Sequence, residues 1–483
     1  MQELRRSHVK VGLALAIVAL GMNVRLAGAQ DIAATQPSLV AANAALEDKV
    51  RVLSAKVDRL EAKEQQTQTD VSAAIQQVLK DVDHHSQLLS TTDLASGYDP
   101  AVGFVIRSDD GLFLLHPGAV LDFRNDTSYR ERIPKGGGGE TGKTGYDTEN
   151  GFDFTRVRFI FDGNFTKDIT YFVQLFADQG APLALLDAYG VYHFGGGSPL
   201  AIKAGQFKDP VWHERNMSEA TLMAVDRSLV EALLGGGQTG RVQGVSLMYD
   251  RDRLRGQLVL HDGFNSINTK FYDLGGIGAG VGGGAGVTPT NFGVTGRGEF
   301  LVIGDRTESF NPWTEYDRQF SALGDKRDIL VLGGGADFSQ AGGNDVLFHT
   351  IDAQYDNTNG FSAYAAYLGS YRDLRVNQGV AAGNSYDPGF LIQAAYLVTP
   401  KIEPFARYDY TYLDGKSVTG LATGEVQEIT IGANYYLYKQ NVKFTLDASW
   451  LPNGAPADAD GLGILKDSGH NEFVIRAQAQ LAL

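Results

Sequence analysis

From residue 98 to the end of the chain, apolar and polar residues alternate. In the segment 152–164, Val157 and Phe159 share one face and Arg156 and Arg158 share the other. A period of two residues is typical of a β-strand with one apolar and one polar face. We expect about sixteen such strands, at 118–129, 152–164, 169–178, 185–194, 199–208, 241–249, 254–262, 292–303, 329–338, 346–356, 361–371, 388–398, 402–412, 426–437, 442–450 and 472–483.

The links between these strands alternate between short and long. Short links include 165–168 and 250–253, and long links include 130–151 and 209–240. Outer-membrane barrels sort their connections in this way, with short turns on the periplasmic side and long loops outside the cell. The chain therefore predicts an all-β fold: a transmembrane antiparallel β-barrel over 98–483, in the cell outer membrane. One link, 304–328, is long on the turn side, and indicates either a periplasmic excursion or a missed strand.

The first 29 residues have the layout of a secretory signal peptide. A basic start with Arg5, Arg6 and Lys10 precedes the apolar run 11–22, and Ala27-Gly28-Ala29 forms a cleavage pattern. The alternative is a retained membrane anchor. A run this short does not span about 30 Å of hydrocarbon, so we expect cleavage.

Residues 30–97 are predicted to form a periplasmic stalk and linker. Apolar positions step by four and three through Leu46, Val50, Leu53, Val57 and Leu60, which is the pattern of an α-helical coiled coil. The alternative is a single amphipathic helix packed on the domain. If the coiled coil forms, residues 46–82 are the segment expected to contact peptidoglycan.

Composition supports this organisation and excludes some functions. The chain has 59 glycines among 483 residues, together with 21 tyrosines and 25 phenylalanines, as expected for many short strands and turns. There is no cysteine, which excludes disulfides and thiolate metal sites. The net charge of −15 argues against nucleic acid as a partner.

No motif indicates catalysis. Residues 137–144 read GGGETGKT, the letters of a phosphate-binding loop, but a strand and not a helix follows, so we interpret them as a surface loop. No nucleophile–base set and no metal-ligand spacing stands out. We therefore expect no enzyme activity, no metal site and no cofactor.

The long link after the fifth strand is expected to fold inward and narrow the pore, with a helix-compatible segment at 218–234. Several of its charged residues have the alternative role of capping the loop or forming salt bridges within it. The residues predicted at the constriction are Lys208, Glu214, Arg215, Glu219, Asp226, Arg227 and Arg241.

Strand phase also places basic residues toward the lumen, where they would raise the local concentration of anions. Acidic residues such as Asp162 and Asp409 share that interior, so its charge is mixed. The basic residues predicted on the lumen wall are Arg156, Arg158, Lys203, Arg253, Arg255, Arg297, Arg407 and Arg476.

Four stretches in this order resemble the phosphate-selective porin O/P family: 154–163 (FTRVRFIFDG), 186–192 (LDAYGVY), 200–210 (LAIKAGQFKDP) and 225–229 (VDRSL). The resemblance implies a sixteen-stranded barrel, a homotrimer, and conduction of small solutes with phosphate or polyphosphate preferred. It matches Arg156, Lys208 and Arg227 to positions of the family's lumen and inward loop. The chain departs from the family at Ser218-Glu219-Ala220, where phosphate-binding members carry a lysine, and at its C-terminal Leu483.

We therefore expect an outer-membrane porin for passive diffusion of small hydrophilic solutes, in contact with lipid, with an anion or phosphate preference as a further expectation. The alternative is a structural protein whose stalk tethers the outer membrane to the cell wall.

Overall fold

The computed structural model describes residues 48–49, 51–52, 54–57, 59, 94–99, 103–130, 147–235, 239–268, 276–277, 288–289, 292–307, 310–318, 327–341, 344–374, 383–414, 424–454 and 471–483. The chain divides into two compact units, Met1–Thr91 and Thr92–Leu483. In the first unit, the described residues between 48 and 59 are helical. The predicted signal peptide and most of the predicted coiled coil lie outside the described residues, as do residues 137–144, so these remain predictions.

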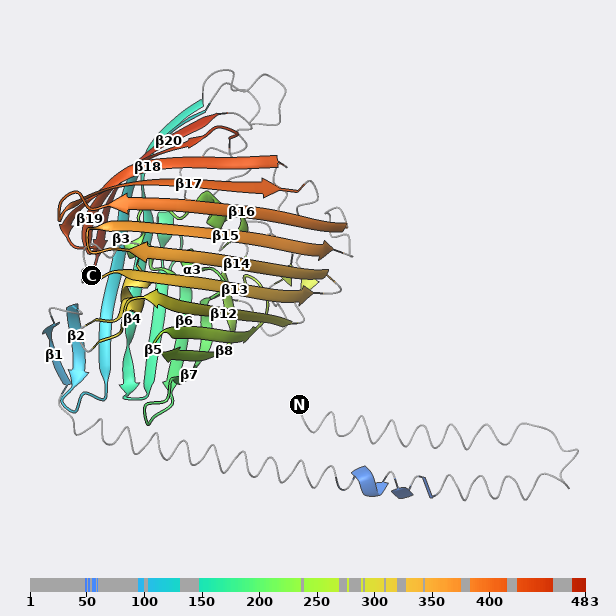
Figure 1. Ribbon diagram of the computed structural model, residues 1–483. Helices are drawn as coiled ribbons and strands as arrows, with labels where there is room; N and C mark the ends of the chain where they lie inside the picture. The colour runs from blue at the N-terminus through green and yellow to red at the C-terminus, as the bar shows by residue number, and fades with distance from the viewer. Residues whose placement is uncertain are drawn as a thin grey trace, which may run out of the picture. The chain divides into compact units, whose positions relative to one another are not determined.

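In the second unit, sixteen of the described strands form a closed antiparallel barrel (Figure 1). Each pairs with the next along the chain, and β20 pairs with β3, with Ala477 opposite Asn125, to close the ring. The strands are β3 (Leu114–Arg130), β4 (Asp147–Thr166), β5 (Ile169–Phe176), β6 (Ala184–His193), β7 (Leu200–Lys208), β8 (Arg241–Arg251), β9 (Leu254–His261), β12 (Phe292–Ile303), β13 (Ile329–Ala341), β14 (Asn344–Asp356), β15 (Phe361–Leu374), β16 (Gly383–Tyr396), β17 (Ile402–Leu413), β18 (Gly424–Tyr438), β19 (Val442–Leu451) and β20 (Glu472–Ala482).

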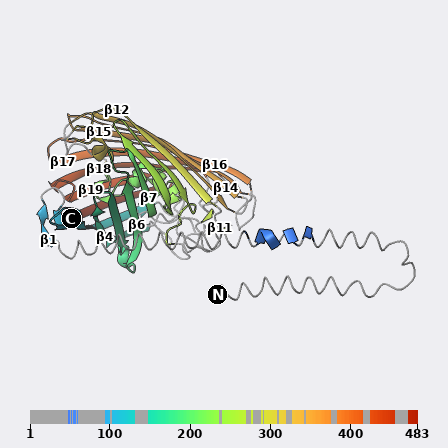
Figure 2. The ribbon, with the colours of Figure 1, turned by 90° about the horizontal axis from the view of Figure 1, so that it is seen from below.

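All sixteen predicted strands are confirmed, with small differences at their ends. The strand order places β4 to β7 across the lumen from β14 to β17, and Figure 2 shows these two walls facing each other. A short two-stranded sheet, β10 (Gly276–Ile277) with β11 (Thr288–Pro289), lies in the connection between β9 and β12.

The predicted alternation of faces is also confirmed. On β19, Leu446 and Trp450 are exposed on the outside, whereas Lys443 and Asp447 are buried on the inside. Exposed apolar side chains cover the exterior all around the barrel; Ile351 on β14, for example, is 68% exposed. A closed barrel leaves no unpaired strand edge, so an apolar exterior of this kind suits contact with hydrocarbon.

A β-bulge in β4 reverses the phase of that strand. Register against β3 shifts at Thr155, which is left without a partner. Phe154 before the bulge and Phe159 after it both point outward. They are five positions apart, an odd number, which would put them on opposite faces of a regular strand. The bulge therefore directs Arg156 and Arg158 toward the lumen.

Besides the two-residue strands β10 and β11, two further strands were not predicted. β1 (Leu94–Asp99) and β2 (Gly103–Ser108) form a hairpin, and β2 pairs with the start of β3 through two residue pairs. β1 begins inside the segment that we assigned to stalk and linker. Their sequences, LASGYD and GFVIRS, do not alternate between apolar and polar residues, so the period of two is absent.

The link on the turn side between β12 and β13 is an excursion. Its described residues, 304–307, 310–318 and 327–328, contain the helix α6 (Pro312–Tyr316) and no strand. Asn311 caps α6, since its side chain accepts a hydrogen bond from the amide of Trp313. The alternative of a missed strand finds no support in these residues.

Over residues 209–235, the link between β7 and β8 contains three short helical turns in place of one helix over 218–234. They are α3 (His213–Asn216), η2 (Glu219–Thr221) and α4 (Leu229–Leu234). A further turn, η1 (Asp178–Gly180), follows β5. None of the helices in the described residues is long and apolar enough to cross a bilayer.

Candidate functional site

The inward loop, whose described residues are 209–235 and 239–240, lies inside the barrel against one wall (Figure 1). α4 contacts β15, β16 and β17, and its Leu233 and Leu234 are buried. With Val211 and Trp212 they form an apolar core with side chains of β14 to β20. Burial of each such side chain contributes roughly 1.5–3 kcal/mol, so this core holds the loop firmly on that side of the lumen.

Asp226, near the middle of the loop, attaches the loop to arginines of the barrel wall. Its carboxylate lies 2.6 Å from the guanidinium groups of Arg124 and Arg156 and 3.7 Å from that of Arg476. Burial alone would raise the pKa of Asp226, but the attraction of these three arginines lowers it to about 2. Asp226 is therefore ionised at neutral pH and balances buried positive charge on β3, β4 and β20.

The stretch before Asp226 is non-helical because its backbone bonds to the wall. Lys443 Nζ donates to the carbonyl of Leu222 at 2.7 Å, and Asn434 Nδ2 donates to the carbonyl of Met223 at 3.0 Å. In a helix those carbonyls would accept from amides four residues later. This competition explains why the predicted helix over 218–234 is broken, and α4 begins only where Ser228 caps it.

A second segment enters the lumen from the turn side. We call residues 304–307 and 310–318 the turn segment; within it Trp313 and Tyr316 are buried. The hydroxyl of Tyr316 lies 2.9 Å from both Arg297 Nη2 and Asp352 Oδ1. The ring of His213 stacks on that of Tyr316 with 3.7 Å between centroids, so the two inward segments touch each other.

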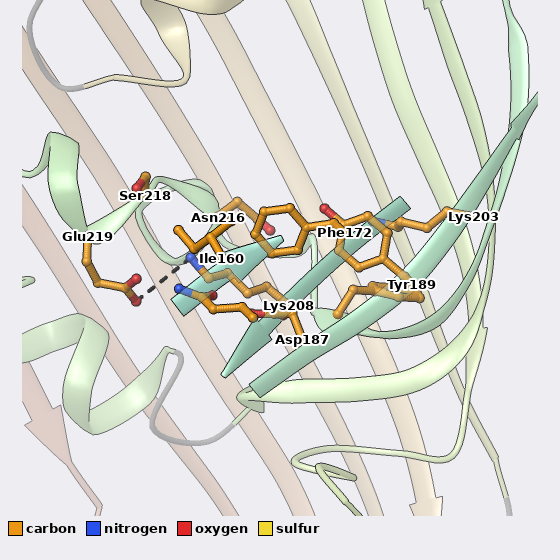
Figure 3. A pocket seen from close by; sticks show the side chains of 11 residues that line it. Ile160, Phe172, Asp187, Tyr189, Lys203, Lys208, Asn216, Ser218 and Glu219 are labelled. Carbon is orange, nitrogen blue, oxygen red and sulfur yellow. Dashed lines mark ion pairs between the residues drawn. The ribbon is translucent and has the colours of Figure 1, made fainter. Parts of the chain in front are cut away.

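A cavity of about 280 Å³ lies between the inward loop and the wall of β4 to β7 (Figure 3). Its lining combines aromatic rings, amides, two lysines and two carboxylates. The lining residues are Ile160, Phe172, Gln174, Asp187, Tyr189, Lys203, Phe207, Lys208, Asn216, Ser218 and Glu219.

Both carboxylates in this cavity have basic partners. Asp187 forms a two-pronged pair with Arg241, with oxygen–nitrogen distances of 2.9 and 2.8 Å. Glu219 accepts a hydrogen bond from Arg227 at 3.1 Å and lies 3.9 Å from Lys208 Nζ, the pair joined by the dashed line in Figure 3. The negative charge in the cavity is therefore largely neutralised.

The residues predicted at the constriction fall into three groups. Lys208 and Glu219 line the cavity. Asp226 and Arg241 tie the loop and β8 to the wall, as described above. The others bond within the loop: Glu214 accepts from Ser228, Arg215 pairs with Glu231 at 3.6 Å, and Arg227 bonds to Glu219 and to backbone carbonyls.

Most of the basic residues predicted on the lumen wall are paired with acids. Arg156 and Arg476 bond to Asp226, Asp122 and Asp447, and Arg407 pairs with Glu428. Arg158 pairs with Asp178, and Arg255 and Arg297 face the turn segment. Lys203 lines the cavity. Arg253 lies not on a strand wall but in the turn between β8 and β9, where its side chain is 44% exposed.

Several residues of the lumen were not predicted. Tyr189, Phe207 and Asp187 line the cavity, and His213 and Tyr316 join the two inward segments. The one signal in the sequence was the presence of Trp313 and Tyr316 in the long turn-side link. Aromatic residues on other strands point to lipid, so residue type alone does not separate the two groups.

Within the described residues, no group of three or more His, Asp or Glu side chains is placed to hold a metal ion. The fold and the lumen together are those of a membrane-spanning β-barrel: a closed ring of strands, apolar outside and polar inside.

The chain matches no family model and no curated protein, so the resemblance to the phosphate-selective porin O/P family is not confirmed. Among solved structures, it is similar to the outer membrane channel DcaP of Acinetobacter baumannii, with 12% identity and a TM-score of 0.49 over 81% of this chain and 100% of that one. It is also similar to OprB of Pseudomonas putida, with 11% identity and a TM-score of 0.48 over 76% of this chain and 94% of that one. For OmpT of Vibrio cholerae the identity is 10% and the TM-score is 0.47, over 78% of this chain and 100% of that one. Similarity at this level does not carry an argument about function.

Proposed function

We propose that this protein is an outer-membrane porin through which small hydrophilic solutes diffuse passively. The observation that carries the proposal is the polar cavity beside β4 to β7, inside a barrel whose exterior is apolar. An apolar exterior suits lipid, and a lumen with charged and amide side chains suits water and polar solutes. The inward loop packs against β14 to β20 and the turn segment against β12 and β14, so the path that we propose runs along the β4–β7 wall.

We infer a preference for anions from the lysines of that path. Lys203 and Lys208 present ammonium groups to the cavity, whereas Asp187 and Glu219 are engaged by arginines. A basic constriction favours anions over cations. A phosphate preference rests on the resemblance alone, because the arginines best suited to bind phosphate are occupied by carboxylates.

Assembly and orientation are also part of the proposal. The resemblance implies a homotrimer, and the short turns would face the periplasm, as in other outer-membrane barrels. A tethering role for residues 46–82 rests on their heptad pattern.

Recording from the purified full-length protein in planar bilayers tests the proposed function. We expect stepwise currents, and reversal potentials in KCl gradients that indicate a higher permeability for chloride than for potassium. Absence of stepwise currents would overturn the porin proposal, and cation selectivity would overturn the anion preference. Deletion of residues 31–95 separates conduction from tethering. If the shortened protein still conducts but the outer membrane detaches from the cell wall, tethering is the main role.

A further inference from the structure

One side of the cavity is an aromatic surface. The rings of Phe172 and Tyr189 stack at 5.3 Å with an angle of 18° between their planes, and Phe207 meets Tyr189 edge-on at 6.2 Å. Ile160 extends this surface. A pore that passes only small inorganic ions has no use for so much aromatic area in its lining, because such ions make favourable contacts with charges and hydrogen-bonding groups.

Lys203 lies at the edge of this aromatic surface. Its ammonium group is 4.0 Å from the centre of the Phe207 ring and, among the described residues, has no carboxylate oxygen within 4 Å to donate to. Its hydrogen-bond partner is the amide oxygen of Gln257 at 3.3 Å. Lys208, by contrast, is held by the carbonyl of Met217 and lies near Glu219. Lys203 is therefore the cavity's cation with the most capacity to bind an anion.

The rest of the lining limits the charge and size of a ligand. Asp187 and Glu219 face the same space but are paired with Arg241 and Arg227, so Lys203 is left to balance one negative charge on a solute. The amides of Gln174 and Asn216 offer hydrogen bonds. At about 280 Å³ the cavity is at the lower end of the range for small-molecule sites, which is roughly 300–1,000 Å³.

We propose that this cavity is a binding site for small organic monoanions that carry a flat apolar body, with the carboxylate on Lys203 and the body against Phe172 and Tyr189. The inference rests on the proposed function and names the substrate class of the same site. Inorganic phosphate fits less well: it carries more charge, has no apolar surface, and is bound best by several donors or by arginine forks.

The test compares four probes as blockers of KCl current through the full-length protein. Benzoate has both the charge and the flat body; acetate has only the charge, benzylamine has the body with the opposite charge, and inorganic phosphate has a higher charge without the body. We expect benzoate to reach half-block at a concentration at least about tenfold below the other three, equivalent to about 1.4 kcal/mol. Equal block by benzoate and acetate would overturn the proposal.

Variants assign the effect to the cavity. We expect Lys203→Met to remove the advantage of benzoate over acetate, and Tyr189→Leu to reduce it while acetate block stays unchanged. Lys167→Met is the matched control, since Lys167 is an exposed lysine of the turn between β4 and β5. If Lys167→Met and Lys203→Met have the same effect, the site is not at Lys203.

A direct binding measurement separates this inference from the proposed function. Calorimetry of benzoate with the detergent-solubilised full-length protein needs no current. Binding that Lys203→Met abolishes supports the site even if the protein forms no channels. If channels form but neither block nor binding by benzoate is detected, the site inference fails and the porin proposal stands.

Discussion

The two halves of the lumen use the same residue types in different ways. Along β14 to β20, with the adjoining β3 and β4, arginines and acids pair with each other and with the inward loop, and α4 adds an apolar core. Along β4 to β7, Lys203 and Lys208 face an open cavity lined with aromatic rings. The difference teaches that a basic residue on a barrel wall contributes to a pore only if no carboxylate has neutralised it.

The largest expected effect is the loss of the loop anchor. Asp226→Asn removes the carboxylate that Arg124, Arg156 and Arg476 share, and breaking buried pairs of this kind costs about 3–5 kcal/mol. We expect the loop to detach, with faster hydrogen exchange of the amides of 209–235 and a higher single-channel conductance. Asp250→Asn is the control, because its half-exposed pair with Arg306 contributes only about 0–1 kcal/mol. Unchanged exchange in Asp226→Asn would show that the apolar core alone holds the loop.

Acid should weaken the same anchor. The pKa of Asp226 is about 2 in the attached loop and would return toward its ordinary value of 3.8 in a detached one. Because the attached value is the lower, ionisation of Asp226 stabilises the attached state above pH 3.8, and this contribution of about 2 kcal/mol is lost as the pH falls toward 2. Hydrogen exchange of the loop measured at pH 6, 4 and 2.5 checks this. The dependence should be absent in Asp226→Asn.

A smaller effect is expected where the two inward segments meet. Tyr316→Phe removes the hydroxyl that bonds to Arg297 and Asp352 but keeps the ring that stacks on His213. Loss of this buried hydroxyl should cost about 1–3 kcal/mol, seen as a lower thermal midpoint of the barrel, with unchanged selectivity. Tyr98→Phe is the control, because Tyr98 is 70% exposed. A change in selectivity would mean that the turn segment also borders the solute path.

The smallest effect on stability, and the clearest one on permeation, is expected at the open half. Lys208→Gln removes one cation from the cavity wall, which changes the interaction with a passing ion by about 1 kcal/mol at contact distance in water. Chloride selectivity should fall several-fold in reversal-potential measurements, while Glu219→Gln should raise it. Lys167→Gln should change neither. An opposite result for the first two variants would place the path elsewhere in the lumen.

The strand pattern was predictable because every barrel strand must be apolar on one face and polar on the other. That requirement located all sixteen strands, and it identified Arg156, Arg407 and Arg476 as facing inward. It did not locate the hairpin of β1 and β2, whose sequences do not alternate, or the bulge at Thr155, because a one-residue insertion leaves no pattern of its own.

The sequence by itself determined the barrel, the alternation of its faces and the presence of an inward loop. Only the tertiary structure decided which charges are neutralised. Asp226 is far from Arg124 and Arg476 along the chain, and Tyr189 and Phe207 resemble the aromatic residues that face lipid. Charge neutralisation depends on distances between side chains on different strands, and those distances follow from strand register and closure of the ring. The arginines that the sequence predicted along the pore are for that reason mainly anchors of the inward segments, and the cavity lies beside Lys203 and Lys208.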